Sequence, residues 1–199
     1  MSLKNAMKQS CDTYFYEVAR LLGVDRLNVT AEKFGLGKKV LGDYYDYEKS
    51  GLFPNTKWKK NNLGKGWVLG ETLITGIGQG YTQTTPLQLC LMTAQIANGG
   101  YSIKPRIVVN NNPMSLEEAK SKLQEETLHG QEKKLFKDHK NIKIVQEAMF
   151  SSTNELYGTS YKSRIDNPKY QFAGKTGTAQ VKRISMRERE LDLKIEQIP

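Results

Sequence analysis

Two short segments of the sequence hold side chains on which nucleophilic or proton-transfer chemistry could depend. Residues 10–12 are Ser-Cys-Asp, which combines a hydroxyl, a thiol and a carboxylate. Residues 175–178 are Lys-Thr-Gly-Thr, and they lie within a segment, 170–181, that is rich in β-forming residues and glycine. Because glycine weakens a strand unless something must approach its backbone closely, this pattern indicates a ligand that lies along residues 175–178.

The first segment also has a purely structural explanation, because Ser and Asp are favoured at helix starts for their hydrogen bonds alone. Apolar residues recur at helical spacing over residues 3–22. They predict one helix that ends near Gln9 and a second that begins at Asp12 or Thr13. Cys11 is a nucleophile in principle, but the sequence places nothing beside it that would activate a thiol. We therefore expect a small packing residue in the helix break.

A third segment, residues 76–81, has the sequence Gly-Ile-Gly-Gln-Gly-Tyr. A Gly-x-Gly-x-Gly run can cradle a phosphate at a helix start, but the matching strand, basic residue and acidic partner are missing, which favours a turn. A helix is predicted over residues 86–97, with Thr85 as its N-cap and Cys90 on its apolar face.

The remaining sequence predicts the elements that must position these segments. Residues 35–66 show little periodicity and are expected to be mostly loop. A capping-box pattern predicts a charged helix from Ser115 to about Leu128. Apolar spacing predicts a helix across Ile142–Phe150, and β-forming residues predict a strand across Tyr170–Val181. That strand must pair with neighbours, since a lone strand leaves its backbone groups unsatisfied.

Composition excludes several classes of protein. The chain has 199 residues, and 38% of them are hydrophobic, which is enough for a packed core. The sequence lacks the ~18 consecutive apolar residues of a membrane span, and its first residues lack the apolar region of a signal peptide. Two cysteines and two histidines are too few for a structural zinc site, so we expect neither a metal nor a cofactor. The net charge of +9 comes from scattered cations, so we expect no nucleic-acid partner.

The order and spacing of these segments resemble a known enzyme family. Ser-x-Asx at a helix break, far upstream of Lys-Thr-Gly on a strand, is similar to two of the three signatures of the penicillin-binding proteins and serine β-lactamases. Further blocks resemble the class B, monofunctional transpeptidases of bacterial cell elongation: residues 76–81, 85–89, 97–100, 158–160 and 173–180. The resemblance covers roughly residues 1–183. Asp12 stands where the wider family more often has Asn, a departure that this subgroup tolerates.

The resemblance implies an α+β fold, in which an antiparallel sheet is flanked by helices beside an all-helical region. It implies a serine-type peptidoglycan D,D-transpeptidase, which cross-links stem peptides through an acyl-enzyme and binds β-lactams as mimics of D-Ala-D-Ala. By resemblance, Ser10 would relay a proton to the leaving group, and Lys175 would sit against Ser10. Asp12 would hydrogen-bond a catalytic lysine or the substrate amide.

The resemblance also implies a substrate-binding role for the residues after Lys175. Thr176 and Thr178 would bind the terminal carboxylate of the stem peptide. The backbone N–H of Thr178 would form half of the oxyanion hole. Gly177, which lacks a Cβ, would let the substrate lie against the edge of the strand.

The third family signature, Ser-x-x-Lys, holds the nucleophile, and no serine of this chain has a lysine three positions later. We therefore expect residues 1–199 to be part of a transpeptidase domain, inactive alone, in which residues 110–141 form a charged insert without a counterpart. By resemblance, the intact protein would lie at the periplasmic face of the bacterial inner membrane and meet membrane proteins of the elongation machinery, whereas this fragment has no anchor. Two alternatives stay open: a serine β-lactamase or β-lactam-sensing domain, and a non-catalytic remnant that binds a partner.

Overall fold

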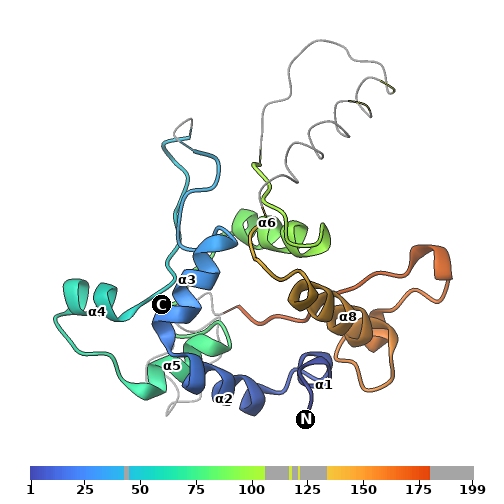
Figure 1. Cartoon of the computed structure of the whole chain (residues 1–199), viewed down its shortest axis with the longest axis horizontal. Helices are drawn as coiled ribbons and strands as arrows, with labels where there is room; N and C mark the ends of the chain where they lie inside the picture. The colour runs from blue at the N-terminus through green and yellow to red at the C-terminus, as the bar shows by residue number, and fades with distance from the viewer. Residues whose placement is uncertain (43–44, 106–116, 118–120, 122–133, 180–199) are drawn as a thin grey trace, which may run out of the picture.

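A computed structural model describes residues 1–42, 45–105, 117, 121 and 134–179 of the chain (Figure 1). These residues form helices joined by turns and extended segments. The helices, in chain order, are α1 (Leu3–Lys8), α2 (Asp12–Leu22), α3 (Val24–Lys33), α4 (Thr56–Leu63), α5 (Leu69–Gly76), α6 (Pro86–Ala97) and α8 (Lys140–Asn154), followed by the short 3₁₀ helices η1 (Tyr161–Ser163) and η2 (Pro168–Tyr170). Within the described ranges, each helix is too short or too polar to cross a lipid bilayer.

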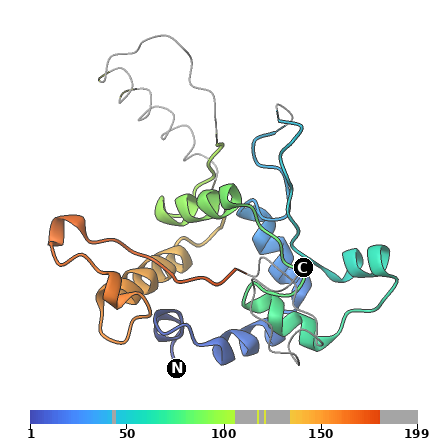
Figure 2. The same cartoon turned by 180° about the vertical axis from the view of Figure 1, so that it is seen from behind.

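The described helices form two groups, which the chain connects where α1 is followed by α2. In the first group, α1 lies against α8, and α6 also contacts α8 (Figure 1). In the second group, α2 packs on α5, and α3 contacts both of them. Seen from behind, α1 again lies beside α8, and the chain runs directly from α1 into α2 (Figure 2). The break between α1 and α2 is therefore one place at which the two groups meet.

Several helix boundaries agree with the sequence patterns. The break between α1 and α2 falls at residues 9–11, as the apolar spacing predicted. At the start of α6, Thr85 Oγ1 accepts from the Gln88 backbone N–H at 3.2 Å, and Gln88 Oε1 accepts from the Thr85 N–H at 3.0 Å. Gln88 is fully buried, and its amide also donates to the carbonyls of Lys38 and Ser50, each at 2.7 Å. One side chain thus caps α6 and ties down the loop in front of it.

The apolar pattern misjudged which face of α6 is buried. Cys90, predicted to lie in the core, is exposed. The buried face of α6 instead carries Gln88, Leu91 and Gln95. Both glutamines donate to loop carbonyls, Gln95 to that of Phe34 at 3.1 Å, so they can be buried without leaving polar groups unpaired. A pattern that counts only apolar residues cannot detect this face.

Residues 35–66 are mostly loop, as predicted, but they also contain a helix, α4, that the sequence analysis missed. Asn55 caps this helix, since its side-chain oxygen accepts from the Trp58 N–H at 2.7 Å. Lys59 of α4 is buried and forms an ion pair with Glu71 of α5. The Tyr81 hydroxyl donates to the same carboxylate at 3.3 Å. Polar contacts rather than an apolar stripe therefore hold α4 in place, which explains why periodicity missed it.

The strand predicted at Tyr170–Val181 is not found in the described part, which ends at residue 179. Residues 168–170 form η2, and residues 171–179 follow without a ladder partner. Their backbone bonds go to α8 instead: the Gly174 N–H donates to the Met149 carbonyl at 3.2 Å. Among the described residues, strand pairing is confined to two isolated bridges, Leu52 with Gln83 and Tyr101 with Lys134. The antiparallel sheet of the expected α+β fold is therefore not found in this part of the chain.

Two further predictions cannot be compared with the structure. The charged helix expected from Ser115 to Leu128 lies almost entirely outside the described residues. The same holds for most of the expected insert, residues 110–141, of which the structure describes residues 117, 121 and 134–141.

The glycine run at residues 76–81 serves packing and turning. A Cβ on Gly76, the last residue of α5, would overlap the Cβ of Ala19 on α2, so a glycine here lets the two helices approach closely. Gly78 follows with a φ of 77°, which glycine adopts without steric cost. The N–H groups of Gly78 and Gln79 donate to carbonyls of α5 rather than pointing at a ligand. The turn interpretation is confirmed, and the phosphate cradle is not.

We predict that Gly76→Ala lowers the free energy of unfolding by about 1–3 kcal/mol, because the new methyl group would force α5 away from Ala19. Gly70→Ala, in the same helix, is the matched control. A Cβ at Gly70 would meet no atom within 4 Å, and alanine is the better helix former, so this variant should gain as much as ~1 kcal/mol. Urea unfolding followed by circular dichroism measures both effects. Equal stabilities of the two variants would contradict the close approach.

Candidate active site around Ser10 and Lys175

Ser10 stands at the end of α1 in the left-handed backbone conformation, with a φ of 51°. The Cys11 N–H donates to the Ala6 carbonyl at 2.9 Å, and the Ser10 N–H donates to the Met7 carbonyl at 3.3 Å. This pair of bonds is the Schellman motif, whose left-handed position is usually occupied by glycine. A side chain there costs roughly 1–2 kcal/mol, because its Cβ crowds the next carbonyl oxygen.

Three other helices end with the same pair of backbone bonds, and each has glycine at the left-handed position. These residues are Gly35 after α3, Gly78 after α5 and Gly99 after α6, with φ of 93°, 77° and 89°. The turn at the end of α1 would be satisfied equally well by glycine. Strained backbone of this kind is concentrated at functional sites. The hydroxyl at position 10 therefore has to be explained by what it contacts.

The Ser10 hydroxyl meets the ammonium group of Lys175. Lys175 Nζ donates to Ser10 Oγ at 2.7 Å, and it also donates to the Thr176 carbonyl at 3.0 Å and to Thr176 Oγ1 at 3.1 Å. Ser10 and Lys175 are 165 residues apart in the sequence. The structure thus brings these two residues together, as the sequence analysis expected. Their catalytic roles stay predictions.

Two opposing effects act on the pKa of Lys175. Partial burial of the ammonium lowers the pKa of Lys175, although the residue as a whole is exposed. Asp12, in the first turn of α2, acts in the opposite direction: its negative charge raises the pKa of Lys175. Asp12, on the other side of the helix break, therefore influences the site through its electrostatic effect on the Lys175 pKa.

The predicted substrate-binding residues are open to solvent. Thr176, Gly177 and Thr178 are all exposed, and a Cβ added at Gly177 would meet no atom within 4 Å. This leaves room for a ligand beside the backbone at residues 176–178.

Cys11 lies between Ser10 and Asp12. Its Sγ is 3.3 Å from Thr13 Oγ1, and this hydrogen bond lowers the pKa of the Cys11 thiol.

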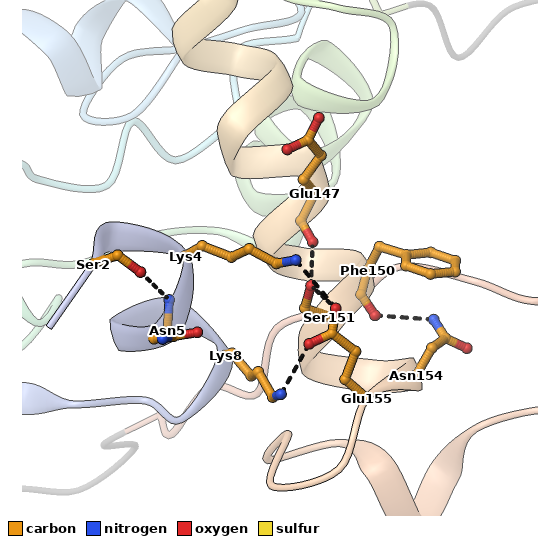
Figure 3. Close-up of polar contacts among 9 residues, drawn as sticks. All are labelled: Ser2, Lys4, Asn5, Lys8, Glu147, Phe150, Ser151, Asn154 and Glu155. Atoms are coloured by element: carbon orange, nitrogen blue, oxygen red, sulfur yellow. Dashed lines mark hydrogen bonds and ion pairs between the residues drawn. The ribbon is translucent and has the colours of Figure 1, made fainter.

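Glu155 attaches α1 to the end of α8, a role that the sequence analysis missed (Figure 3). Lys8 Nζ donates to Glu155 Oε2 at 2.9 Å, and Lys4 Nζ and Ser151 Oγ donate to Oε1 at 3.1 and 2.8 Å. The hydrogen bonds from Lys8, Ser151 and Lys4 lower the pKa of Glu155 to about 2. Two lysines four residues apart on α1 were the only signal in the sequence, and their partner lies 147 residues beyond Lys8.

The segment that carries Lys175 is attached to the same end of α8. The Asn154 side-chain amide donates to the Phe172 carbonyl at 2.9 Å, and the Gly174 N–H donates to the Met149 carbonyl at 3.2 Å. A Cβ on Gly174 would come within 3.3 Å of Thr153 Oγ1, so the segment lies close to the helix surface. Both halves of the Ser10–Lys175 pair are therefore held by the last two turns of α8.

The protein family and the curated proteins that this chain resembles are all described as transpeptidases. A family described as "Penicillin binding protein transpeptidase domain" matches residues 1–190. A peptidoglycan D,D-transpeptidase MrdA from Acinetobacter baumannii is 35% identical over 200 residues, which cover 95% of this chain and 26% of the relative. The MrdA of Haemophilus influenzae is 34% identical and covers 94% of this chain and 27% of the relative. The chain thus spans about a quarter of the length of these curated relatives.

The chain is also similar to solved structures of penicillin-binding proteins. A crystal structure of Pseudomonas aeruginosa PBP2 in complex with WCK 5153 is 38% identical, with a TM-score of 0.73, over 91% of this chain and 39% of that one. A complex between PBP2 and MreC from Helicobacter pylori is 31% identical, with a TM-score of 0.73, over 91% of this chain and 31% of that one.

We predict that Ser10→Gly is more stable than Ser10→Ala by about 1 kcal/mol. Both variants lack the hydroxyl, so the difference between them measures the left-handed strain at the end of α1. Gly78→Ala, at the equivalent position of α5, is the matched control and should cost a similar amount. Denaturant unfolding of the three variants measures these differences. If Ser10→Gly and Ser10→Ala unfold at the same denaturant concentration, the strain is absent.

We also predict that Glu155→Gln flattens the acid dependence of stability. The pKa of Glu155 in the folded chain is about 2, below its ordinary value of 4.5, so this carboxylate stabilises the fold above pH 4.5 and its contribution is lost as the pH falls toward 2. Because the side chain is partly exposed, we expect only about 0.2–1 kcal/mol. Urea unfolding at several pH values between 2 and 6 measures the slope. Lys8→Met should flatten it too, and unchanged slopes in both variants would contradict the attachment.

Proposed function

The chain belongs to the penicillin-binding protein transpeptidase domain family, and from this premise we propose that its described residues form one wall of a peptidoglycan D,D-transpeptidase site. The observation that carries the proposal is the 2.7 Å contact between Lys175 Nζ and Ser10 Oγ. It joins the Ser-x-Asx and Lys-Thr-Gly segments, which are the two family signatures that this sequence contains. The substrate would be the D-Ala-D-Ala end of a stem peptide, and β-lactams would mimic it.

The proposed role of Ser10 is proton transfer. In the family reaction a serine hydroxyl attacks the carbonyl of the D-Ala-D-Ala bond, the C–N bond breaks, and the leaving amine gains the proton that the attacking hydroxyl loses. The attacking serine belongs to a Ser-x-x-Lys segment, which these 199 residues do not contain. Ser10 would pass the proton to the leaving amine, since its Oγ already accepts an N–H from Lys175. The cation beside Ser10 makes a negative charge on its oxygen less costly while the proton moves.

We further propose that Asp12 and the residues after Lys175 position the substrate. Asp12 supports the positive charge of Lys175 and would also accept a hydrogen bond from a catalytic lysine or from the substrate amide. The Lys175 ammonium and the hydroxyls of Thr176 and Thr178 offer donors for a terminal carboxylate. Because Gly177 has no side chain and open space beside it, the peptide backbone could approach closely there.

The proposal extends to the fold and to the surroundings of the intact protein. Residues 171–179 form no helix and are exposed apart from the half-buried Gly174, which would allow them to join an antiparallel sheet as the family fold implies. The Helicobacter pylori relative has been solved in complex with MreC. We therefore propose that the intact protein meets a membrane protein of the elongation machinery at the periplasmic face of the inner membrane.

The test is covalent labelling with a fluorescent penicillin. The protein to use is an extended form of this chain, preceded by a Ser-x-x-Lys segment of the family, and it should label. Ser10→Ala in the extended form should lower the acylation rate constant by at least about 100-fold, the usual contribution of a proton-transfer residue. Ser163→Ala, which changes an exposed serine in η1, is the matched control and should label like the parent.

The 199-residue chain alone should not label. Covalent labelling of this chain at Ser10 or Cys11 would contradict the proposed mechanism, because the nucleophile would then lie within these residues. An acylation rate that is unchanged by Ser10→Ala would remove the proton-transfer role.

A further inference from the structure

Thr159 lies at the centre of four hydroxyl groups beside Lys175. This hydroxyl cluster consists of Ser10, Ser152, Thr159 and Thr176. Thr159 Oγ1 lies 3.2 Å from the hydroxyl oxygen of each of the other three residues. Ser10 and Thr176 also contact one another at 3.3 Å, whereas Ser152 contacts the cluster through Thr159. Thr159 is thus the one member of the cluster that contacts all three of the others.

Counting donors and acceptors shows what Thr159 does for Ser10. A hydroxyl has one hydrogen to donate and two lone pairs to accept with. Ser10 Oγ accepts an N–H from Lys175, and its own hydrogen is donated to Thr159 Oγ1. These two bonds, together with the 3.3 Å contact to Thr176, restrain the position of Ser10 Oγ. Without the acceptor at Thr159, the Ser10 hydroxyl would lose the group to which it donates and would keep only its contacts with Lys175 and Thr176.

Thr159 is itself held firmly, so it can serve as a fixed reference. Its backbone N–H donates to the Lys8 carbonyl at the end of α1, at 3.1 Å. Its hydroxyl contacts Ser152, which is fully buried in α8. The preceding residue, Gly158, has no room for a Cβ, which would overlap the carbonyl of Ser152. The next N–H, that of Ser160, donates to the same Ser152 carbonyl at 3.1 Å.

We propose that Thr159 is a positioning residue, whose hydroxyl holds Ser10 Oγ in reach of the Lys175 ammonium and the Thr176 hydroxyl. The role in acylation rests on the function proposed above for Ser10, but the placement of the hydroxyl does not. Thr159 is exposed, and two backbone bonds attach residues 158–160 independently of its hydroxyl: the Thr159 N–H donates to α1 and the Ser160 N–H donates to α8. Removing only the hydroxyl should therefore leave the fold intact and disturb the cluster.

The first experiment uses the 199-residue chain and needs no activity. Lysine labelled with ¹³C at Cε is titrated by NMR, and the Lys175 signal is assigned with Lys175→Arg. In Thr159→Val the pKa of Lys175 should fall below its value in the parent chain, because a less restrained Ser10 Oγ accepts less well from the ammonium and the new methyl group excludes water. Thr159→Ser keeps the hydroxyl and should restore the parent titration. Thr93→Val, an exposed threonine of α6, is the matched control and should titrate like the parent.

The second experiment measures acylation by fluorescent penicillin in the extended form. Thr159→Val should lower the rate constant of the acylation step about tenfold while leaving the initial binding of penicillin unchanged, and Thr159→Ser should stay within about twofold of the parent. A residue that only stabilised the fold would change the unfolding temperature without moving either the Lys175 titration or this split between binding and acylation.

The outcomes separate this proposal from the proposed function. A Thr159→Val titration that superimposes on that of the parent would overturn the positioning role, and so would a Thr159→Ser variant that behaves like Thr159→Val. If the titrations move as expected but the extended parent is not acylated, the hydroxyl cluster stands and the transpeptidase assignment fails.

Discussion

The C-terminal end of α8 holds together two segments that are 165 residues apart, and the site depends on this attachment. On one side, Glu155 binds both lysines of α1, which places the turn that carries Ser10. On the other side, Asn154 and the Met149 carbonyl bind the segment that ends in Lys175. Each segment would be free to move without these contacts, since α1 is short and residues 171–179 lack a strand partner in the described part of the chain. The 2.7 Å contact between Ser10 and Lys175 thus depends on the side chains and carbonyl groups of the last two turns of α8, which hold both segments in place.

Small polar residues make this end of α8 suitable for the task. Residues 151–153 are Ser-Ser-Thr, and all three are buried. Small side chains allow α1 and residues 158–160 to approach the helix closely. Their hydroxyls are not left unpaired: Ser151 Oγ lies 2.8 Å from both the Glu147 carbonyl and Glu155 Oε1, Ser152 contacts Thr159, and Thr153 donates to the Met149 carbonyl. A leucine-rich helix end would bury more apolar surface, but it would offer no hydrogen bonds to fix the orientation of the two segments.

Much of the helical framework could be predicted from the sequence, and so could the meeting of Ser10 with Lys175, because both rest on spacing and on ordered motifs. The prediction failed where polar contacts replace apolar ones. The helix expected at Ile142–Phe150 is present and continues to Asn154. Apolar spacing could not predict this extension, because the buried residues of the last turn are Ser and Thr. Residues 171–179 have the composition of a strand, yet their bonds go to a helix that local sequence cannot reveal. Glu155 acts through partners distant in the sequence, and no local pattern marks it. Thr159 lies in a block that resembles the family, but that block does not show which groups its hydroxyl contacts.

The hydroxyl cluster around Thr159 has a consequence for how quickly the site can respond to a ligand. Each of its hydrogens turns about a single C–O bond, and at exposed positions such rotations take picoseconds to nanoseconds. A bound group that accepts from Ser10 more strongly than Thr159 does can therefore redirect that hydrogen while every oxygen and nitrogen keeps its place. Ser10 would then exchange one acceptor for another without any movement of the backbone while Lys175 still donates to it, so recognition here carries almost no cost of reorganisation.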